Sequence, residues 1–272
     1  MTTPPPLTDL TALARNRARA QADALFLHET ARDEVQDRLA MVNRTFTDVA
    51  VVTPFPQVWQ GAIPGARIVP DAEVLDLTEG TQDLVIHALC LHWSNDPVGQ
   101  LIQCRRALRP DGLLMAVSFG GTTLHELRSA LAAAEVAETG GLSPRVLPMG
   151  EIRDLGGLLQ RAGFALPVAD SLPLTVSYAT PLHLMRDLRA MGEGNALAAR
   201  LRHPTRRGVL LRAAQSYAET HAGPDGRIPA TFELIFLHGW APDDSQQKPL
   251  RPGSAAQRLA DALGTKESPL KD

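Results

Sequence analysis

The chain has 272 residues, of which 44% are apolar, and its 30 acidic and 27 basic side chains give a formal net charge of −3. This length supports one large α/β core, or one core with an added cap, but not two large separate domains. The excess of acidic residues argues against a nucleic-acid partner, because such proteins carry a basic footprint. With Cys90 and Cys104 as the only cysteines, we expect reduced, buried thiols and no metal site, since a structural zinc needs four ligands.

The N-terminal region, residues 1–48, is predicted to hold a tail and one helix. Residues 1–6 are rich in proline, and these prolines together with Asp9 argue against an amphipathic targeting helix. The chain also lacks a run of about 18 apolar residues, so we expect no transmembrane segment and a cytoplasmic protein. Glu29–Met41 mixes charged with apolar residues in a pattern typical of an amphipathic helix.

Two short strands are predicted next. Val49–Val52 is an apolar run of buried-strand length, and the stretch Thr53-Pro54-Phe55-Pro56 ends it, because proline has no backbone N–H. Gln57–Gln60 has room for one helical turn. Arg67–Val69 begins a second strand, which Pro70-Asp71 ends.

The segment Asp83–Gly121 is the most informative part of the chain, since it is typical of a strand, a helix and a strand in succession. Leu84–Leu91 is an apolar run typical of a strand buried on both faces. Asp96-Pro97 supplies an N-cap and a first-turn proline, and apolar residues at helical spacing and then arginines follow. Pro110-Asp111-Gly112 stops that helix and turns the chain into the strand Leu113–Phe119. The segment therefore predicts a parallel crossover.

The remaining chain continues to alternate. Helices are predicted at Thr122–Ala137, Met149–Ala162, Pro181–Met191 and Thr205–Thr220. Val168–Tyr178 is predicted as a strand pair or one long bent strand, and Ala230–His238 as the last strand. The fold class is therefore α/β, with a doubly wound, mostly parallel, Rossmann-like sheet. A helical cap over about residues 180–228, inserted before the last strand, is expected over the carboxyl edge, where open α/β sheets bind ligands.

The motifs of this chain resemble those of one family. Asp83–Gly121 contains a hydrophobic strand, LHW, ND, a helix and LRPDG, and is similar to the fourth strand, helix and fifth strand of class I S-adenosylmethionine (SAM) dependent methyltransferases. The motifs FGGTTLHELR, GGLSPRVLPM, DLGGLLQRAGF, LMRDLRAMGEGN and ATFELIFLHGW resemble one branch, the methyltransferase-like assembly factors of respiratory complex I, related to malonyl-carrier-protein O-methyltransferases of biotin synthesis. The similarity covers residues 67–254, and we predict a methyltransferase-like domain at 49–254 and a C-terminal tail at 255–272.

The resemblance implies a SAM site at the carboxyl ends of the first strands, with Thr53, Asp71 and Ala88 as cofactor-binding residues. In the family the first strand ends in a glycine-rich loop, because glycine lets the backbone approach the carboxypropyl group of SAM. The matching stretch here, Val49–Pro56, contains no glycine and has two prolines. The usual backbone cradle is therefore not expected in this chain.

The N-terminal half of the sheet is predicted to be shortened. About thirty residues separate Val49 from Asp83, whereas a complete strand, helix, strand, helix, strand passage needs about fifty to sixty. One strand-helix unit is therefore missing. Ile68–Leu77 is similar to the family's third strand, whose acidic residue, here Asp71, contacts the adenine, and the acidic residue that holds the ribose has no counterpart.

The substrate pocket that the resemblance implies includes His92, Trp93 and Gly120. The alternative is that the first two are a satisfied histidine and a packed indole at a strand-helix junction, and that the glycine only permits a bend. Arg186, Arg189 and Glu193 in the cap either contact a protein or acyl substrate or form a solvated charged face, and the solvated face is favoured.

Together these features predict a SAM-dependent methyltransferase family protein with a degenerate SAM-binding loop, which acts in assembly or maturation of complex I with a complex I subunit as its partner. SAM is the cofactor that the resemblance implies. Two alternatives stay open: a non-catalytic methyltransferase-fold scaffold, and an active methyltransferase on a carrier-protein acyl group or a protein. The branch also includes a protein-arginine hydroxylase activity, which the resemblance permits. No catalytic residue is named, because placing the acceptor in line with the sulfonium supplies most of the rate in methyl transfer.

Overall fold

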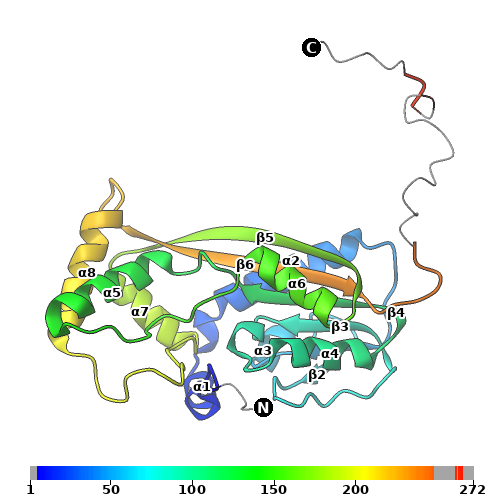
Figure 1. The fold of residues 1–272 in the computed structure, drawn as a ribbon, viewed down its shortest axis with the longest axis horizontal. Coiled ribbons are helices and arrows are strands. Elements are labelled where there is room, and N and C mark those ends of the chain that lie inside the picture. The colour runs from blue at the N-terminus through cyan, green and yellow to red at the C-terminus, as the bar shows by residue number, and fades with distance from the viewer. Residues whose placement is uncertain (1–4, 248–260, 262, 266–272) are drawn as a thin grey trace. The chain divides into compact units, whose positions relative to one another are not determined.

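Six strands form one sheet in the computed structural model, which describes residues 5–247, 261 and 263–265 (Figure 1). The strands are β1 (Val49–Val52), β2 (Arg67–Val69), β3 (Gln82–Ala88), β4 (Leu108–Phe119), β5 (Ala165–Tyr178) and β6 (Ile228–Trp240). Their order is β2-β1-β3-β4-β6-β5. The first four pair in parallel, and β6 runs antiparallel to both β4 and β5. The predicted mostly parallel α/β sheet is confirmed.

Helices cover both faces of this sheet. They are α1 (Leu10–Arg17), α2 (Phe26–Met41), α3 (Pro56–Trp59), α4 (Pro97–Ala107), α5 (His125–Thr139), α6 (Ile152–Arg161), α7 (Pro181–Ala190) and α8 (Arg207–His221). One hydrophobic core joins the sheet to α2, α3, α5, α7 and α8, with Val35, Trp59 and Leu127 among its members. The opposite core joins it to α4 and α6 through Leu101 and Leu159. The sheet is therefore doubly wound, as predicted.

The crossover from β3 through α4 to β4 forms as predicted, except at the start of β4. All of β3 is buried, and the carboxylate of Asp96 accepts from the N–H of Gly99 at 2.8 Å, which caps α4. The strand β4 begins at Leu108 and not at the predicted Leu113, because Leu108 already pairs with Gln82 before a register shift. The expected turn is therefore an irregularity within the strand.

The N-terminal half of the sheet is short, as predicted. Between β1 and β3 the structure has only the single turn α3 and the strand β2. This strand pairs directly with β1, where Val52 lies opposite Val69. The carboxyl ends of β1, β2 and β3 therefore lie side by side at one edge of the sheet.

The cap inserted before the last strand is confirmed. Val168–Tyr178 belongs to one long strand, β5, and not to a strand pair. The helices α7 and α8 follow β5 and precede β6 in the chain. Figure 1 shows them together with α5 at one end of the long strands β5 and β6. α5 packs on α8, so the cap also includes a helix that lies outside the predicted range of about residues 180–228.

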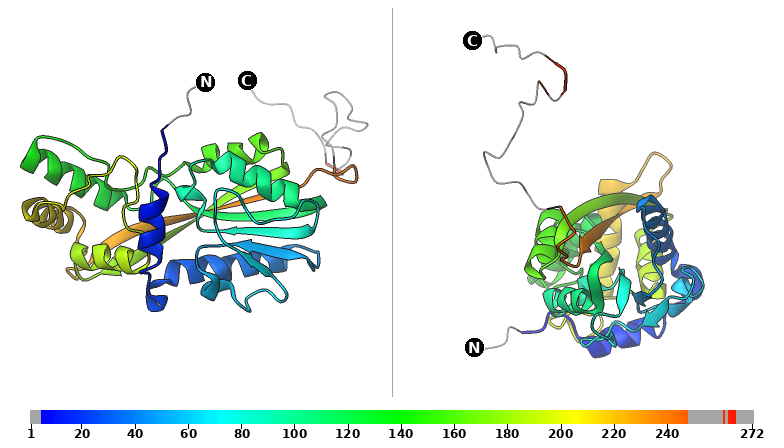
Figure 2. Two further views of the ribbon diagram at one scale, coloured as in Figure 1. Left: turned by 90° about the horizontal axis from the view of Figure 1, so that it is seen from below. Right: turned by 90° about the vertical axis from the view of Figure 1, so that its right-hand side faces the viewer.

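The helix α1 was not predicted. The one helix expected before residue 48 was Glu29–Met41. The carboxylate of Asp9 caps it by accepting from the N–H of Ala12 at 3.0 Å. In Figure 2 (left) α1, in dark blue, crosses the molecule between the sheet and the cap helices. Its apolar side packs on Trp93, Leu147 and Leu197. The N-terminal region is therefore part of the structure at the carboxyl edge.

The described residues up to Pro242 form one compact unit. Most of the predicted tail, residues 255–272, lies outside the described residues. Within the described ranges, no helix is long and apolar enough to cross a membrane.

Candidate functional site

The loop after β1 uses its own backbone donors. The N–H of Thr53 donates to the carbonyl of Val69 at 2.9 Å, and the N–H of Phe55 donates to Oγ1 of Thr53 at 3.1 Å. Pro54 and Pro56 have no N–H. Residues 53–56 therefore have no backbone donor left for a ligand, and they do not fit the carboxylate end of SAM in the way that a glycine-rich loop does.

Asp71 follows β2, and its carboxylate already has a partner from α1. Arg17 donates from Nη1 to Oδ2 of Asp71 at 2.5 Å, across 54 residues of sequence. The two side chains are only 11% and 18% exposed. Burial raises the pKa of Asp71, while the charge and hydrogen bond of Arg17 act in the opposite direction. The position that the resemblance assigns to adenine recognition therefore faces a guanidinium of the same chain.

Ala88, the last residue of β3, is 1% exposed and belongs to the hydrophobic core. The preceding His87 is also buried, with its Nε2 at 3.3 Å from Oε1 of Gln100. Burial lowers the pKa of His87 to about 4, so the ring is neutral at ordinary pH. Ala88 therefore offers no open side chain to a ligand, and His87 borders only a small cavity of about 40 Å³.

Three polar side chains meet where the sheet edge reaches the cap. Trp93 donates from Nε1 to Oε2 of Glu193 at 2.6 Å, and Nε2 of His92 lies 3.3 Å from the same oxygen. The side chains of His92 and Glu193 are 2% and 6% exposed. The favoured prediction of a solvated face is therefore wrong for Glu193. Its Gly-Glu-Gly-Asn setting is typical of a turn, so no sequence signal marks this residue as buried.

A cavity of about 210 Å³ lies beside Glu193. Its wall is mainly apolar and includes Trp93, Phe119, Leu124, Leu127, Leu131, Val146, Leu147, Met149, Met185, Leu188 and Phe232. Its charged and amide side chains are Arg145, Arg189, Glu193 and Asn195. Trp93 is thus a packed indole that also forms part of a pocket wall, while His92 contacts Glu193 and does not line the cavity.

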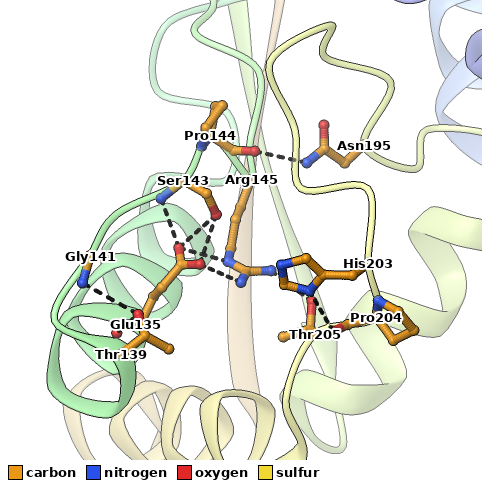
Figure 3. Close-up of polar contacts among 10 residues, drawn as sticks. All are labelled: Glu135, Thr139, Gly141, Ser143, Pro144, Arg145, Asn195, His203, Pro204 and Thr205. Atoms are coloured by element: carbon orange, nitrogen blue, oxygen red, sulfur yellow. Dashed lines mark hydrogen bonds and ion pairs between the residues drawn. The ribbon is translucent and has the colours of Figure 1, made fainter.

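The wall segment around Arg145 is held by an ion-pair network, shown in Figure 3. Glu135 of α5 accepts from Nε and Nη2 of Arg145 at 3.0 and 2.6 Å, and from Oγ of Ser143. Arg145 also donates from Nη1 to Oγ1 of Thr205 at 2.8 Å, and Asn195 donates to the carbonyl of Pro144. The network therefore joins α5 to the segment between α7 and α8 across one side of the cavity.

Gly120, predicted to line the pocket, lies against β6. Its N–H donates to the carbonyl of Glu233 at 2.8 Å. A Cβ atom at this position would lie 2.6 Å from Oε2 of Glu233 and 2.6 Å from Cδ1 of Ile235. Because glycine has no side chain, the chain after β4 can pack closely against β6.

Several buried polar atoms near Glu193 lack a hydrogen-bond partner among the described residues. They are Nε and Nη2 of Arg17, both ring nitrogens of His28, Nδ1 of His92 and Oε1 of Glu193. Each buried polar atom left unpaired costs about 1–3 kcal/mol, so such atoms are normally paired. The buried region around Glu193 is therefore short of hydrogen-bond partners among the described residues. In the same described ranges, no group of three or more His, Cys, Asp or Glu side chains could hold a metal ion.

Comparisons with known proteins identify similar sequences and structures. A family model described as a methyltransferase domain matches residues 34–116. The arginine-hydroxylase NDUFAF5, mitochondrial, of Danio rerio is 41% identical over 199 residues, covering 73% of this chain and 62% of that protein. The malonyl-[acyl-carrier protein] O-methyltransferase of Laribacter hongkongensis is 37% identical over 188 residues, covering 69% of this chain and 61% of that protein. A SAM-dependent methyltransferase of Thermotoga maritima has a TM-score of 0.44 and 12% identity, covering 86% of this chain and 100% of that one.

The chain spans about three fifths of the length of the curated relatives it matches. Similarity to the NDUFAF5 proteins is higher than similarity to the malonyl-carrier-protein methyltransferases, and both were expected from the motifs. The chain is therefore similar to the methyltransferase domain family over residues 34–116 and, over a longer stretch, to the NDUFAF5 proteins and the malonyl-carrier-protein methyltransferases.

Proposed function

We propose that this chain acts in the assembly or maturation of respiratory complex I, and that it receives an arginine side chain of a complex I subunit in the cavity beside Glu193. The Danio rerio relative is named as an arginine hydroxylase, which supports an arginine as the bound group. The proposal assigns recognition of that side chain to this protein and does not assign a chemical step.

The buried carboxylate of Glu193 is the observation that carries this proposal. Its Oε2 is held by Trp93 and His92, while Oε1 has no hydrogen-bond partner among the described residues. A carboxylate matches a guanidinium in charge and in planar, forked geometry. The apolar cavity wall fits the methylene stem of an arginine, which packs on apolar surface while its head pairs with charge.

Binding of a short peptide with one central arginine tests this function. The wild-type protein is expected to bind it at least about tenfold more tightly than the same peptide with citrulline, which has the same shape without the charge. Isothermal titration calorimetry of both peptides measures the difference. Equal affinity for the two peptides would mean that Glu193 does not select a cation.

SAM is not expected to bind in the pose that its relatives use. The donors of residues 53–56 are already used, and Arg17 occupies the carboxylate of Asp71. Titration with SAM should therefore give no heat at micromolar ligand, with circular dichroism to show that the protein is folded. Micromolar binding of SAM would instead support an active methyltransferase.

The second candidate function is that active methyltransferase, with a carrier-protein acyl group or a protein as acceptor. Its support is the name of the Laribacter hongkongensis relative.

A third candidate function, a non-catalytic scaffold, differs from arginine hydroxylation in one measurable way. A scaffold would leave the mass of the bound subunit unchanged, whereas hydroxylation would add one oxygen atom to it.

The cytoplasm stays our prediction for the compartment. The Danio rerio relative is named as mitochondrial. A complex I subunit stays the predicted partner. Fractionation of cells that carry the tagged protein would test the compartment.

A further inference from the structure

Arg17 is the last residue of α1, and the surrounding chain fixes its position from two sides. On the cap side, Asn16 donates from Nδ2 to the carbonyl of Gly194 at 2.9 Å, and the N–H of Gln21 donates to the carbonyl of Ala190 at 2.8 Å. On the sheet side, Arg17 itself pairs with Asp71 at 2.5 Å. The helix therefore connects the sheet edge with the segment that carries Glu193.

The backbone next to Glu193 touches Arg17 directly. Gly192 has a φ of +88°, and a Cβ at this position would lie 3.3 Å from Cα of Arg17 and 3.2 Å from Cζ of Phe55. Only glycine combines this backbone conformation with so close an approach. The segment before Glu193 is thus shaped to pack against the end of α1.

Without Arg17, the carboxylates of Asp71 and Glu193 would lose a nearby positive charge. Asp71 and Glu193 are two buried carboxylates, and Arg17 is the guanidinium whose charge acts on both. The other titratable groups that face Glu193 are His28 of α2 and His92 after β3. Burial lowers the pKa of His28 to about 4, so this ring adds no charge at ordinary pH. Loss of Arg17 would remove one of the charges that favour the ionised form of Glu193, so it would favour protonation of a carboxyl group here.

We propose that Arg17 is a positioning residue for the cavity. It pairs with the carboxylate of Asp71, and its charge favours the ionised form of Glu193, so that the cavity selects a cationic side chain. This inference rests on the proposed function. Burial opposes ionisation of Glu193, but the hydrogen bond with His92 and the charges of His92 and Arg17 outweigh it and hold its pKa at about 2. Arg17 thereby influences the contact between Glu193 and the bound arginine side chain, although Arg17 does not touch that side chain itself.

Arg17→Met and Arg17→Lys test this role, with Arg15→Met on the exposed side of α1 as the matched control. Wild type, Arg17→Lys and Arg15→Met are expected to bind the arginine peptide equally between about pH 5 and pH 8, because Glu193 stays ionised there. In Arg17→Met the pKa of Glu193 rises, so arginine-peptide binding should weaken at a higher pH than in the wild type as the pH is lowered, while citrulline-peptide binding stays constant. A flat profile in a folded Arg17→Met variant would show that Arg17 only supports the fold.

A second measurement separates this inference from the proposed function. The ¹³C shift of the Glu193 carboxyl group reports its ionisation by nuclear magnetic resonance without any peptide. If the wild type does not distinguish arginine from citrulline, the proposed function fails, yet the titration still decides the role of Arg17. A Glu193 titration that Arg17→Met leaves unchanged overturns the inference. Should Arg17→Met fail to fold, Asp71→Asn and Arg17→Lys, which both keep the cation, must still show the wild-type titration.

Discussion

Complex I activity is expected to fall to the level of a deletion strain when the chromosomal copy of this chain carries Glu193→Gln. Glutamine keeps an oxygen that accepts from Nε1 of Trp93, so the fold is preserved, but it removes the negative charge beside the cavity. Loss of one partner of a buried charge pair costs about 2–5 kcal/mol of binding, which is thirtyfold or more. The measurement is NADH oxidation by isolated membranes, normalised to succinate dehydrogenase.

The matched control is Glu79→Gln, the same chemical change at an exposed residue between β2 and β3. This strain should keep wild-type complex I activity. Succinate dehydrogenase should be unchanged in both strains, because the proposed role concerns complex I alone. Normal complex I activity in a strain with stable Glu193→Gln protein would remove Glu193, and with it the arginine site, from the function.

Local sequence signals predict most of the sheet and its helices, because each element carries its own apolar period and its own end signal. β3 contains the apolar run Leu84–Ile86 and is buried along its whole length, and Asp96 before Pro97 marks the first turn of α4. The missing strand-helix unit follows from chain length alone, since too few residues separate Val49 from Asp83 for two helices. These inferences need no knowledge of distant contacts.

The site depends on distant contacts, and for that reason it could not be predicted. Glu193 is buried by Trp93, 100 residues earlier, and its turn sequence alone is typical of a solvated loop. Asp71 was correctly placed at a strand end, but its partner is Arg17 of an unpredicted helix. The resemblance named the edge of the sheet where ligands are expected, and the structure shows which side chains meet there.

The Glu135–Arg145 pair is expected to contribute most to the stability of the cavity wall. Arg145→Met should lower the free energy of unfolding by about 3 kcal/mol, because it leaves a buried carboxylate without its cation. The two side chains are 4% and 15% exposed. Chemical denaturation followed by circular dichroism measures this loss. Arg212→Met is the matched control, because it breaks a more exposed pair with Glu138 and should cost less than about 1 kcal/mol.

The pH dependence of the same variant identifies the cause. The hydrogen bonds from Arg145 lower the pKa of Glu135 from 4.5 to about 2, with burial opposing and Ser143 assisting. A depressed carboxyl pKa adds stability above its unfolded value, and that stability is lost as the pH falls toward 2. Wild type and Arg212→Met should therefore lose stability between these values, and the loss should be smaller in Arg145→Met. If Arg145→Met keeps the full acid-dependent loss, another group is responsible and the ion pair does not hold the wall.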